Sequence, residues 1–411
     1  MTMKTTRLAL AATAALLCSH HLGAQTPPSA SLIRSVAART FVLVVKADGS
    51  VVGWGNEGDG LAARPRSQSG VAGSPVAIDL PGKARRVAVG EGAAYALLED
   101  GTVVAWGANA DGQLGRGAIG ANVELGTYPK PSPTPVKVTG LHDIIQIEAG
   151  ARHALALRKD GTVWAWGSRD DGTLGDGDAR GGRVLRVVGA LAPIAVPGLN
   201  GITQIATGWK HNLALRQDGH VMSWGTNSDG ELGNGTRVIG WTPAEVTGLD
   251  HVVAIAAGSG AAHGVSGAIR DDGTVWLWGS NASAMLGNVE SPLSPDDPGG
   301  RNPLPVQVKG ITGAKRLSIG EGHVAVLLGD GTLRMWGHDG WGQIGVGTSG
   351  GYHGKPTKVA ALTSVAAVYL GGAHSFAVRA DGTFWMWGFG FYRGLGVIGK
   401  DLHVPTRLDL P

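Results

Sequence analysis

Cysteine is almost absent from this chain of 411 residues, in which the single cysteine is Cys18. Cys18 lies in an apolar N-terminal segment that we expect to be removed, which leaves no disulfide, thiol nucleophile or cysteine-ligated zinc. Leu17 precedes it, where a lipid-modified cysteine would follow Gly or Ala, so we expect no lipid anchor. The fold must therefore be held by non-covalent interactions.

Charge and long apolar runs are also scarce. Only 16% of the residues are charged, and of the formal net charge of +3 two charges belong to Lys4 and Arg7, leaving +1 without them. A surface this close to neutral lacks the basic field that non-specific nucleic-acid binding requires, so we expect no nucleic-acid partner. After residue 24 no stretch approaches the roughly 18 uninterrupted apolar residues of a membrane-spanning helix, and we expect no span.

Residues 1–24 have the composition of an export signal. A short basic region is followed by an apolar run from Leu8 to Leu17 and by the small residues Gly23 and Ala24. This order is typical of a secretory signal peptide. We predict that the protein is periplasmic or secreted and that residues 25–29 form a short leader.

Glycine and proline, by contrast, are abundant. The chain has 69 Gly and 20 Pro, a content that favours turns over helices. An Asp-Gly pair followed by Trp-Gly six residues after the Asp occurs seven times. The aspartates are Asp48, Asp100, Asp160, Asp218, Asp272, Asp330 and Asp381. The tryptophans are Trp54, Trp106, Trp166, Trp224, Trp278, Trp336 and Trp387.

Each copy predicts a β-hairpin, as the third copy illustrates. Apolar runs flank Asp160 and Gly161, and Asp-Gly between such runs is a strong signal for a two-residue type I′ turn. With that turn, Leu155 would face Trp166 across the hairpin, and large apolar residues would share one face while small residues fill the other. A hairpin without a polar face must be sandwiched between neighbours, as in a propeller.

Two further strands complete each copy. An apolar stretch such as residues 144–147 precedes the hairpin, and a segment that opens with proline follows it, which the first position of a strand allows. The sequence therefore predicts an all-β fold, a seven-bladed β-propeller of four-stranded antiparallel blades over residues 30–411. The prolines are Pro75, Pro135, Pro193, Pro243, Pro305, Pro356 and Pro405.

The two ends of the chain predict how the ring closes. From each of these prolines to the next turn aspartate the chain counts 25 residues in five of six cases, and placing residue 30 after Pro411 restores 25 for the last one. We therefore predict that the strand at Leu408–Leu410 pairs with the strand at residues 32–37. Such pairing of the N- and C-terminal strands would remove the free sheet edges.

The succession Gly-x-x-His, Ala-Leu, Asp-Gly, Val-x-x-Trp-Gly and Gly-x-Leu-Gly, complete in the third and fourth copies, resembles the regulator of chromosome condensation repeat family. The first two copies have Phe41 and Ala93 in place of the histidine, and the first lacks Leu-Gly after Gly60. The resemblance implies a seven-bladed propeller. Its nearest functional precedent is an exported β-lactamase-inhibitory propeller. The best-known member is a nuclear exchange factor for a small GTPase, a role that export argues against.

Catalytic and metal-binding patterns are weak. The repeat histidines His153, His211, His323 and His374 belong to different blades, whereas a metal needs three or four converging ligands, so we interpret them as structural. Residues 347–351 match the Gly-x-Ser-x-Gly pattern around Ser349, but the strand-turn-helix context of a hydrolase nucleophile is not predicted there. We therefore expect no enzyme activity, no metal and no cofactor.

Length variation points to a binding face. From the repeat tryptophan to the next proline the distance ranges from 18 to 29 residues, and the other insertion lies between the first two strands of the fifth copy. All these loops emerge on one face of the disc, and repeat scaffolds place insertions on the binding face. Aromatic residues are the usual anchors of protein interfaces. The candidates on this face are Trp209, Trp241, Trp341, Tyr128, Tyr352, Phe389, Phe391 and Tyr392.

We therefore predict an exported, monomeric, non-enzymatic propeller that binds another protein through this face and inhibits a secreted enzyme such as a class A β-lactamase. The alternative is a carbohydrate-binding lectin or a hydrolase that uses the same loops, because exposed tryptophans also stack on sugar rings. A convergent set of carboxylates or histidines on that face would favour the alternative.

Overall fold

The computed structural model describes residues 33–63, 71–118, 120–124, 126–178, 187–260, 263–288, 300–390 and 400–411. The predicted signal peptide (1–24) and leader (25–29) lie outside these residues. Among the described residues the helical elements are two single turns, η1 (Gly58–Gly60) and η2 (Asp170–Gly172). No helix of this part of the chain is long and apolar enough to cross a membrane.

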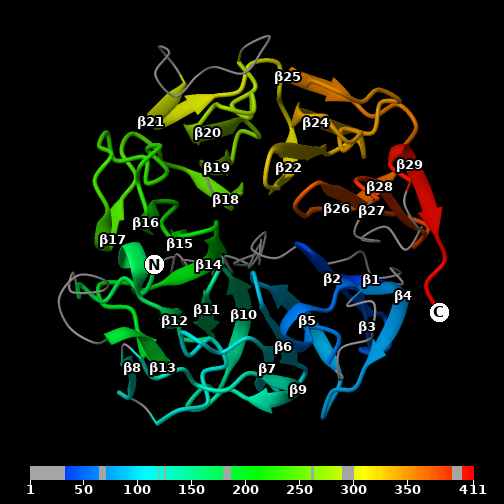
Figure 1. Cartoon of the computed structure of the whole chain (residues 1–411). Coiled ribbons are helices and arrows are strands. Elements are labelled where there is room, and N and C mark those ends of the chain that lie inside the picture. Colours follow the sequence, from blue (N-terminus) through cyan, green and yellow to red (C-terminus); the bar gives the residue numbers. More distant parts are fainter. Residues whose placement is uncertain are drawn as a thin grey trace, which may run out of the picture.

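Seven sheets surround a central channel as the blades of a propeller, which confirms the predicted fold (Figure 1). In every blade four strands follow one another in antiparallel order from the channel outwards. The inner strands, which line the channel, are β1 (Ile33–Ala38), β5 (Ala84–Val89), β10 (Ile144–Ala149), β14 (Ile202–Thr207), β18 (Val252–Gly260), β22 (Ala314–Ile319) and β26 (Val365–Leu370). We number the blades 1 to 7 in this order.

The second strands are β2 (Phe41–Lys46), β6 (Ala93–Leu98), β11 (His153–Arg158), β15 (His211–Arg216), β19 (His263–Arg270), β23 (His323–Leu328) and β27 (His374–Arg379). The third strands are β3 (Val51–Asn56), β7 (Val103–Gly107), β12 (Val163–Ser168), β16 (Val221–Gly225), β20 (Val275–Ser280), β24 (Leu333–His338) and β28 (Phe384–Gly388). The outer strands are β4 (Val71–Ile78), β9 (Ser132–Lys137), β13 (Val187–Ala195), β17 (Gly240–Glu245), β21 (Arg301–Gln307), β25 (Tyr352–Lys358) and β29 (Leu402–Leu408). A short strand from the blade 2 loop, β8 (Asn122–Glu124), extends the blade 3 sheet by pairing with β13.

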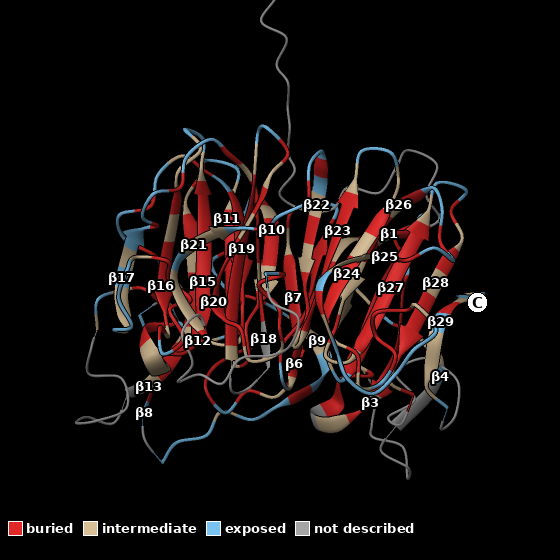
Figure 2. Cartoon of the chain, turned by 90° about the horizontal axis from the view of Figure 1, so that it is seen from above, coloured by how far each residue is buried: buried red, intermediate tan, exposed pale blue. Residues whose placement is uncertain are grey.

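The strand order gives the disc two different faces. Loops that join the first to the second strand and the third to the outer strand emerge on one face, here called the loop face. Hairpin turns and the links between blades emerge on the other, the turn face. Buried residues fill the middle of the disc, and exposed residues gather in the connections on both faces (Figure 2).

The hairpin turns differ from the predicted two-residue type. In blade 3 the Gly161 N–H donates to the Arg158 carbonyl (3.0 Å), and the Arg158 N–H donates to the Thr162 carbonyl (2.9 Å). Gly161 has φ +82°, so this is a type I turn followed by a left-handed glycine, the usual three-residue hairpin loop. The Asp160 carboxylate accepts hydrogen bonds from the Thr162 N–H (3.0 Å) and hydroxyl (2.6 Å). The aspartate therefore fastens the turn.

The extra loop residue shifts the predicted register by one. Leu155 faces Ala165, and Trp166 faces Ala154, instead of Leu155 facing Trp166. Each sheet face therefore has its own large residues: tryptophan lies among alanines on one face, and leucine and valine lie on the other. The sandwiching of the sheet that we predicted is correct, although the pairing behind it was wrong.

The hydrophobic core lies between blades. Trp166 and Ala154 pack in one cluster with Tyr95 of blade 2, while Leu155 packs in another with Trp224 of blade 4. The tryptophan face of each blade thus meets the aliphatic face of the preceding one. All seven repeat tryptophans are 0% exposed, so they are core residues.

The repeat tryptophans also donate hydrogen bonds across the blade boundary. Among the described residues, six of these indoles donate their Nε1–H to a backbone carbonyl in the preceding blade, at 2.6–3.2 Å. The carbonyl belongs to the Gly-x-Leu-Gly loop or its equivalent. The glycine that ends this loop lies against the indole, and a Cβ on Gly115 would come within 2.9 Å of the Trp166 Nε1. The acceptors are Leu61, Gln113, Thr173, Glu231, Met285 and Gln343.

The ring does not close by pairing of the terminal strands, so that prediction was wrong. β29 pairs with β28 at the outer edge of blade 7, and β1 pairs with β2 at the inner edge of blade 1. An inner and an outer strand of a four-stranded sheet are three strand spacings apart, about 14 Å, and cannot pair. Closure comes instead from packing: Phe376 and Met386 of blade 7 share a hydrophobic cluster with blade 1, and the Lys46 ammonium donates to the Pro411 carbonyl (2.7 Å). The count of 25 residues from a proline to the next turn aspartate therefore shows that the two ends belong to neighbouring blades, and it does not show that their strands pair.

We expect Trp166→Ala to reduce the free energy of unfolding by about 3–5 kcal/mol, because it opens a cavity between two blades. Trp166→Phe retains most of the ring packing but loses the hydrogen bond to Gln113, and it should cost less. Urea denaturation of both variants measures the difference. Wild-type stability in Trp166→Ala would contradict the core assignment.

Candidate protein-binding face

Exposed large apolar side chains are distributed unequally over the disc. Among the described residues none of them lies in a hairpin turn or blade link of the turn face. They occur in the loops of the loop face or on outer strands: Tyr128 (72% exposed), Val238 (72%), Leu304 (44%), Trp341 (42%), Tyr352 (45%) and Val404 (47%). The loop face is therefore the more apolar of the two faces.

Three of these six side chains belong to blades 6 and 7, and one of them, Trp341, contacts across the boundary between these blades. Trp341 lies in the loop before β25, and its ring contacts Phe389, which follows β28, with ring centroids 4.6 Å apart. Tyr352 opens β25 and contacts the His338 ring at 5.1 Å. Val404 lies on β29 of blade 7. We call Trp341, Tyr352, Phe389 and Val404 the aromatic corner.

Buried polar residues hold the loop that carries Trp341. The Asp339 side chain is 2% exposed, and its Oδ1 accepts the Ile344 N–H at 3.0 Å. Its Oδ2 accepts from the Thr348 hydroxyl (2.8 Å) and lies 3.2 Å from the His353 Nε2. Gln343 fixes the other side, because its Oε1 accepts the Trp341 N–H (2.9 Å). Trp341 is thus presented by an ordered loop, which lowers the entropic cost of binding.

Asp339 occupies a position that other blades also use. In blades 2, 4 and 5 the third residue after the repeat tryptophan is an asparagine whose Oδ1 accepts a backbone N–H five residues later (3.0 Å). These residues are Asn109, Asn227 and Asn281. Our reading of the sequence missed this role, although the recurring Trp-Gly-x-Asn/Asp spacing is visible in the printed chain.

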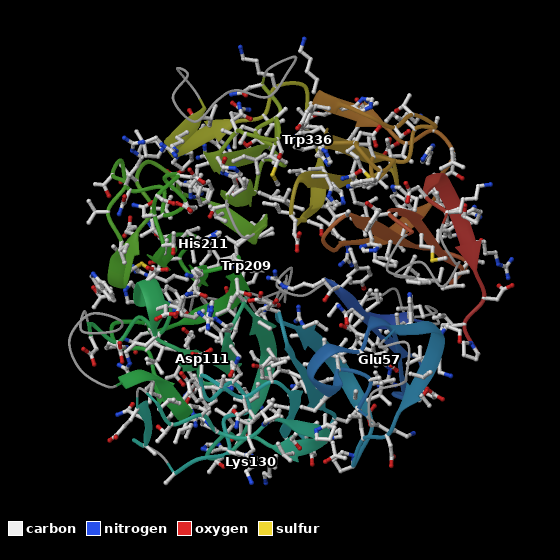
Figure 3. The ribbon with its side chains drawn as sticks, in the orientation of Figure 1. Glu57, Asp111, Lys130, Trp209, His211 and Trp336 are labelled. Atoms are coloured by element: carbon white, nitrogen blue, oxygen red, sulfur yellow. The ribbon has the colours of Figure 1, made fainter. Side chains whose placement is uncertain are left out.

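Trp209 lies apart from the aromatic corner, at the mouth of the channel (Figure 3). It is half-buried in the loop between β14 and β15, and the Arg39 guanidinium lies over its ring, 5.1 Å from the centroid. Its carbonyl accepts the Ala151 N–H of the neighbouring blade (2.8 Å). Trp209 therefore has a structural contact as well as partial exposure.

The remaining candidates are scattered. Tyr128 is exposed in the long loop of blade 2. Trp241 is not a loop residue as we predicted: it is the second residue of β17, half-buried, and its carbonyl accepts the Gly177 N–H of blade 3 (2.9 Å). Phe391 and Tyr392 lie outside the described residues. Of the eight aromatics, the structure brings Trp341 and Phe389 into contact.

The repeat histidines lie between blades. The His153 Nε2 is 2.8 Å from the Asn212 Oδ1 of the next blade, and the His323 Nε2 is 2.9 Å from the Ser375 hydroxyl. Asn212 and Ser375 in turn donate to the carbonyls of Thr173 and Gln343, which also accept a repeat indole. The described residues include no cluster of three or more side chains suited to a metal ion.

The Gly-x-Ser-x-Gly match has no nucleophile geometry. Residues 347–351 belong to the loop before β25 and lead into a strand, where a hydrolase elbow leads into a helix. Ser349 is exposed in this loop.

Charged residues of the channel are a feature that our sequence analysis missed. A cavity of about 560 Å³ lies on the axis, lined by all seven inner strands. Five arginines and two glutamates line it, an excess of three positive charges: Arg34, Arg39, Arg85, Arg86, Arg316, Glu148 and Glu321. The sequence contained a signal for these charges, because arginines stand within inner strands that are otherwise apolar.

The fold and its interblade tryptophans define the class of protein as a seven-bladed β-propeller built from one repeat. Known proteins share that repeat. The regulator of chromosome condensation (RCC1) repeat matches residues 100–157, 160–215 and 218–262, and a second description of the same repeat matches residues 84–113, 144–173 and 202–231. Residues 84–262 of the chain therefore carry RCC1 repeats.

Relatives of this chain differ widely in size. The ultraviolet-B receptor UVR8 of Arabidopsis thaliana is 29% identical over 342 residues, which cover 80% of this chain and 71% of the receptor. The human E3 ubiquitin-protein ligase HERC2 is 29% identical over 310 residues, covering 74% of this chain but 6% of the ligase. The crystal structure of Prp20p from Saccharomyces cerevisiae superposes with a TM-score of 0.72 and 25% identity, covering 89% of this chain and 87% of that one.

We expect acid to destabilise the propeller through its buried histidines. Burial lowers the pKa of His153, His211 and His374 to about 4 and that of His323 to about 3. In the unfolded chain these groups bind protons near pH 6.5, so their contribution to stability is fully present above about pH 6.5 and is lost as the pH falls toward 4. Urea denaturation between pH 7 and pH 4 should show this loss.

His374→Phe is the matched variant for this test. Blade 1 has Phe41 at the equivalent position, where it pairs with Gly55 as His374 pairs with Gly388. Because both ring nitrogens of His374 are buried without a hydrogen-bond partner among the described residues, phenylalanine should be tolerated and should weaken the pH dependence. An unchanged pH dependence would show that His374 is protonated at no cost in the folded protein.

Proposed function

We propose that this protein is an exported, non-enzymatic propeller that binds a partner protein through its loop face, with the aromatic corner as the anchor. The observation that carries the proposal is the concentration of exposed apolar side chains at the blade 6–7 boundary of that face. Tryptophan and tyrosine dominate the energetics of protein interfaces because they bury a large area at a low entropic cost. Trp341 and Tyr352 have this character, and an ordered loop presents Trp341.

The relatives support protein binding in general rather than one partner. Prp20p is described by its binding to Gsp1p and histones, and a second structure has yeast RCC1 (Prp20) bound to Kap60. The signal-like residues 1–24 and the near-neutral charge favour different partners for this chain. We infer a partner in the periplasm or outside the cell, and detection of the cleaved chain in that fraction tests the export.

A catalytic role for the loop face has little to support it. The carboxylates around the aromatic corner are engaged in holding loops, as Asp339 is, and Ser349 lacks the geometry of an activated nucleophile. A lectin places polar side chains beside exposed aromatic rings, and His338 beside Tyr352 is one such pair. Sugar-array binding by the mature protein is the experiment that would favour this alternative.

Trp341→Ala should weaken binding to a captured partner by about 2 kcal/mol or more while leaving the melting temperature nearly unchanged, because the side chain is half-exposed and anchors no strand. The partner is to be captured from periplasmic and secreted extracts with the mature protein and then titrated by calorimetry. Lys159→Ala on the turn face is the control and should bind as the wild type does. Equal affinity of both variants would refute the aromatic corner as the anchor.

An inhibitory role makes a sharper prediction. The mature protein should suppress a secreted hydrolase, with a class A β-lactamase as the first to assay, in a stoichiometric titration and without turnover of its own. Trp341→Ala should raise the concentration needed for half inhibition. Hydrolysis by the purified protein that disappears in Ser349→Ala would instead establish an enzyme.

A further inference from the structure

The hairpin turns of the turn face are balanced in charge in several blades. In blades 3, 4 and 7 an arginine ends the second strand and pairs with the turn aspartate two residues later: Arg158 with Asp160, Arg216 with Asp218 and Arg379 with Asp381. In blade 6 Leu328 replaces this arginine, and the turn aspartate is Asp330. The cations around the blade 6 hairpin come from other positions instead.

Lys315, the second residue of β22, lies along the blade 6 hairpin. A Cβ on Gly329, in the turn, would lie 3.4 Å from the Lys315 Cε and 3.7 Å from its Cγ. The other six blades have a residue larger than glycine at the position of Gly329. The glycine therefore leaves room at this turn for a lysine of the inner strand.

Arg334 and Lys358 add two cations on neighbouring strands. Arg334 of β24 lies directly opposite Lys358 of β25. Directly opposite residues of an antiparallel sheet have Cβ atoms about 4.5–5.5 Å apart, and like charges in this arrangement are destabilising. In the other six blades the equivalent pair never consists of two cations. The blade 6 pair therefore carries an energetic cost that the fold does not require.

Asp330 only partly neutralises these cations. Its carboxylate accepts the Thr332 N–H (2.8 Å), and the hydrogen bonds from Thr332 lower its pKa more than the attraction of Lys358 does. Among the described residues Lys315 and Arg334 have no hydrogen-bond or ion-pair partner. One exposed carboxylate therefore faces three cations at this hairpin.

A fourth cation, Lys309, stands in the link that enters blade 6. Lys309 is exposed, and Val308 before it packs in the same hydrophobic cluster as Trp336. Trp336 lies two residues after Arg334 on β24, so the link lies against the sheet face that carries Arg334. We call Lys309, Lys315, Arg334 and Lys358 the basic patch, and these four cations with Asp330 have an excess of three positive charges.

The surroundings of the basic patch favour a narrow anionic chain as its ligand. The described hairpin turns and blade links expose no large apolar side chain that could anchor a protein, and the patch has no aromatic ring on which a nucleic-acid base could stack. The adjacent hairpin of blade 5 and the link before it expose Asp250, Asp271 and Asp272 against Arg270. A flat anionic membrane would meet these carboxylates as well, whereas a chain can follow blade 6 alone.

We propose that the basic patch binds an acidic polysaccharide, a sugar chain that carries carboxylate or sulfate groups. Such a group can accept two parallel hydrogen bonds from the planar Arg334 guanidinium, while the ammonium of Lys358 neutralises it from the opposite strand. The anion would then remove the repulsion between these two side chains. The patch lies on the turn face and the aromatic corner on the loop face, so this binding is independent of the protein partner.

Titration calorimetry with the mature protein tests this binding, with heparin as the sulfated probe, polygalacturonate as the carboxylated probe and neutral dextran as the control. We expect the anionic chains to bind and dextran not to bind. The logarithm of the affinity should fall with the logarithm of the salt concentration with a slope of about −3, because the four cations of the patch displace counterions. Binding of one anionic probe supports the proposal and identifies the group that is recognised, whereas binding of neither overturns it.

Other blades supply matched variants. Arg334→Met installs the residue of blade 4, and Lys358→Gln installs that of blade 5. Each should weaken the binding of heparin by about threefold or more and reduce the salt slope by about 1. Gly329→Glu, with the residue of blade 2, retains every cation but places a carboxylate beside Lys315, and it should also weaken binding. Lys159→Gln, in the blade 3 hairpin, removes an exposed cation outside the patch and should bind as the wild type does.

Melting temperatures separate the loss of a contact from the loss of the fold. Arg334→Met should not lower the melting temperature, because it removes the repulsion from Lys358. An equal loss of heparin binding in Lys159→Gln and Arg334→Met would show general charge attraction and would overturn the patch as the site. Binding to phosphatidylglycerol vesicles that exceeds binding to both polysaccharides would overturn the choice of ligand in favour of a membrane.

Discussion

The hydrogen bond from a repeat indole to a carbonyl of the preceding blade, which the described residues show for six of the seven indoles, is the contact on which the ring depends. It fixes the distance and the angle between neighbouring blades, and the buried ring supplies the hydrophobic contact at the same point. In blades 2, 3, 4 and 6 a second donor shares that carbonyl, as Asn212 does with Trp224 at Thr173. Both lone pairs of a buried acceptor are then used, which makes the junction expensive to break. Without disulfides, junctions of this kind, of which the described residues show six, must hold the disc.

The junction requires a backbone carbonyl at a fixed place in the loop, and it does not require a particular residue type there. Blade 1 lacks the Leu-Gly pair, yet the Leu61 carbonyl still accepts the Trp106 indole at 2.9 Å. Ala63 takes the left-handed conformation, with φ +53°, that glycine adopts in other blades. A non-glycine residue is strained there, so the junction is maintained at some energetic cost. At the closure of the ring the buried Trp54 of blade 1 shares a hydrophobic cluster with Phe376 and Met386 of blade 7.

Spacing in the sequence was sufficient to predict the blade number, the strand count and the burial of the seven tryptophans. It was insufficient for register, because Asp-Gly occurs both in two-residue turns and in the three-residue loop around Gly161, and the two differ by one residue. Closure was mispredicted because a count along the chain cannot distinguish neighbouring blades from paired strands. The contact between Trp341 and Phe389 joins different blades and has no sequence signal of its own.

A repeat architecture separates structural from functional residues in a way that the sequence alone conceals. The tryptophan, the histidine and the loop glycine recur because every blade boundary needs them, so their recurrence argues for stability. Function is then to be sought where one blade departs from its neighbours at an equivalent position. Tyr369 is such a departure, because the equivalent position holds alanine in four blades, serine in blade 6 and Glu148 in blade 3. The half-exposed Trp341 is another, in a loop whose other features are shared. Neither side chain is required by the junctions, and each therefore can change without loss of the fold, which is the property that a site of recognition needs.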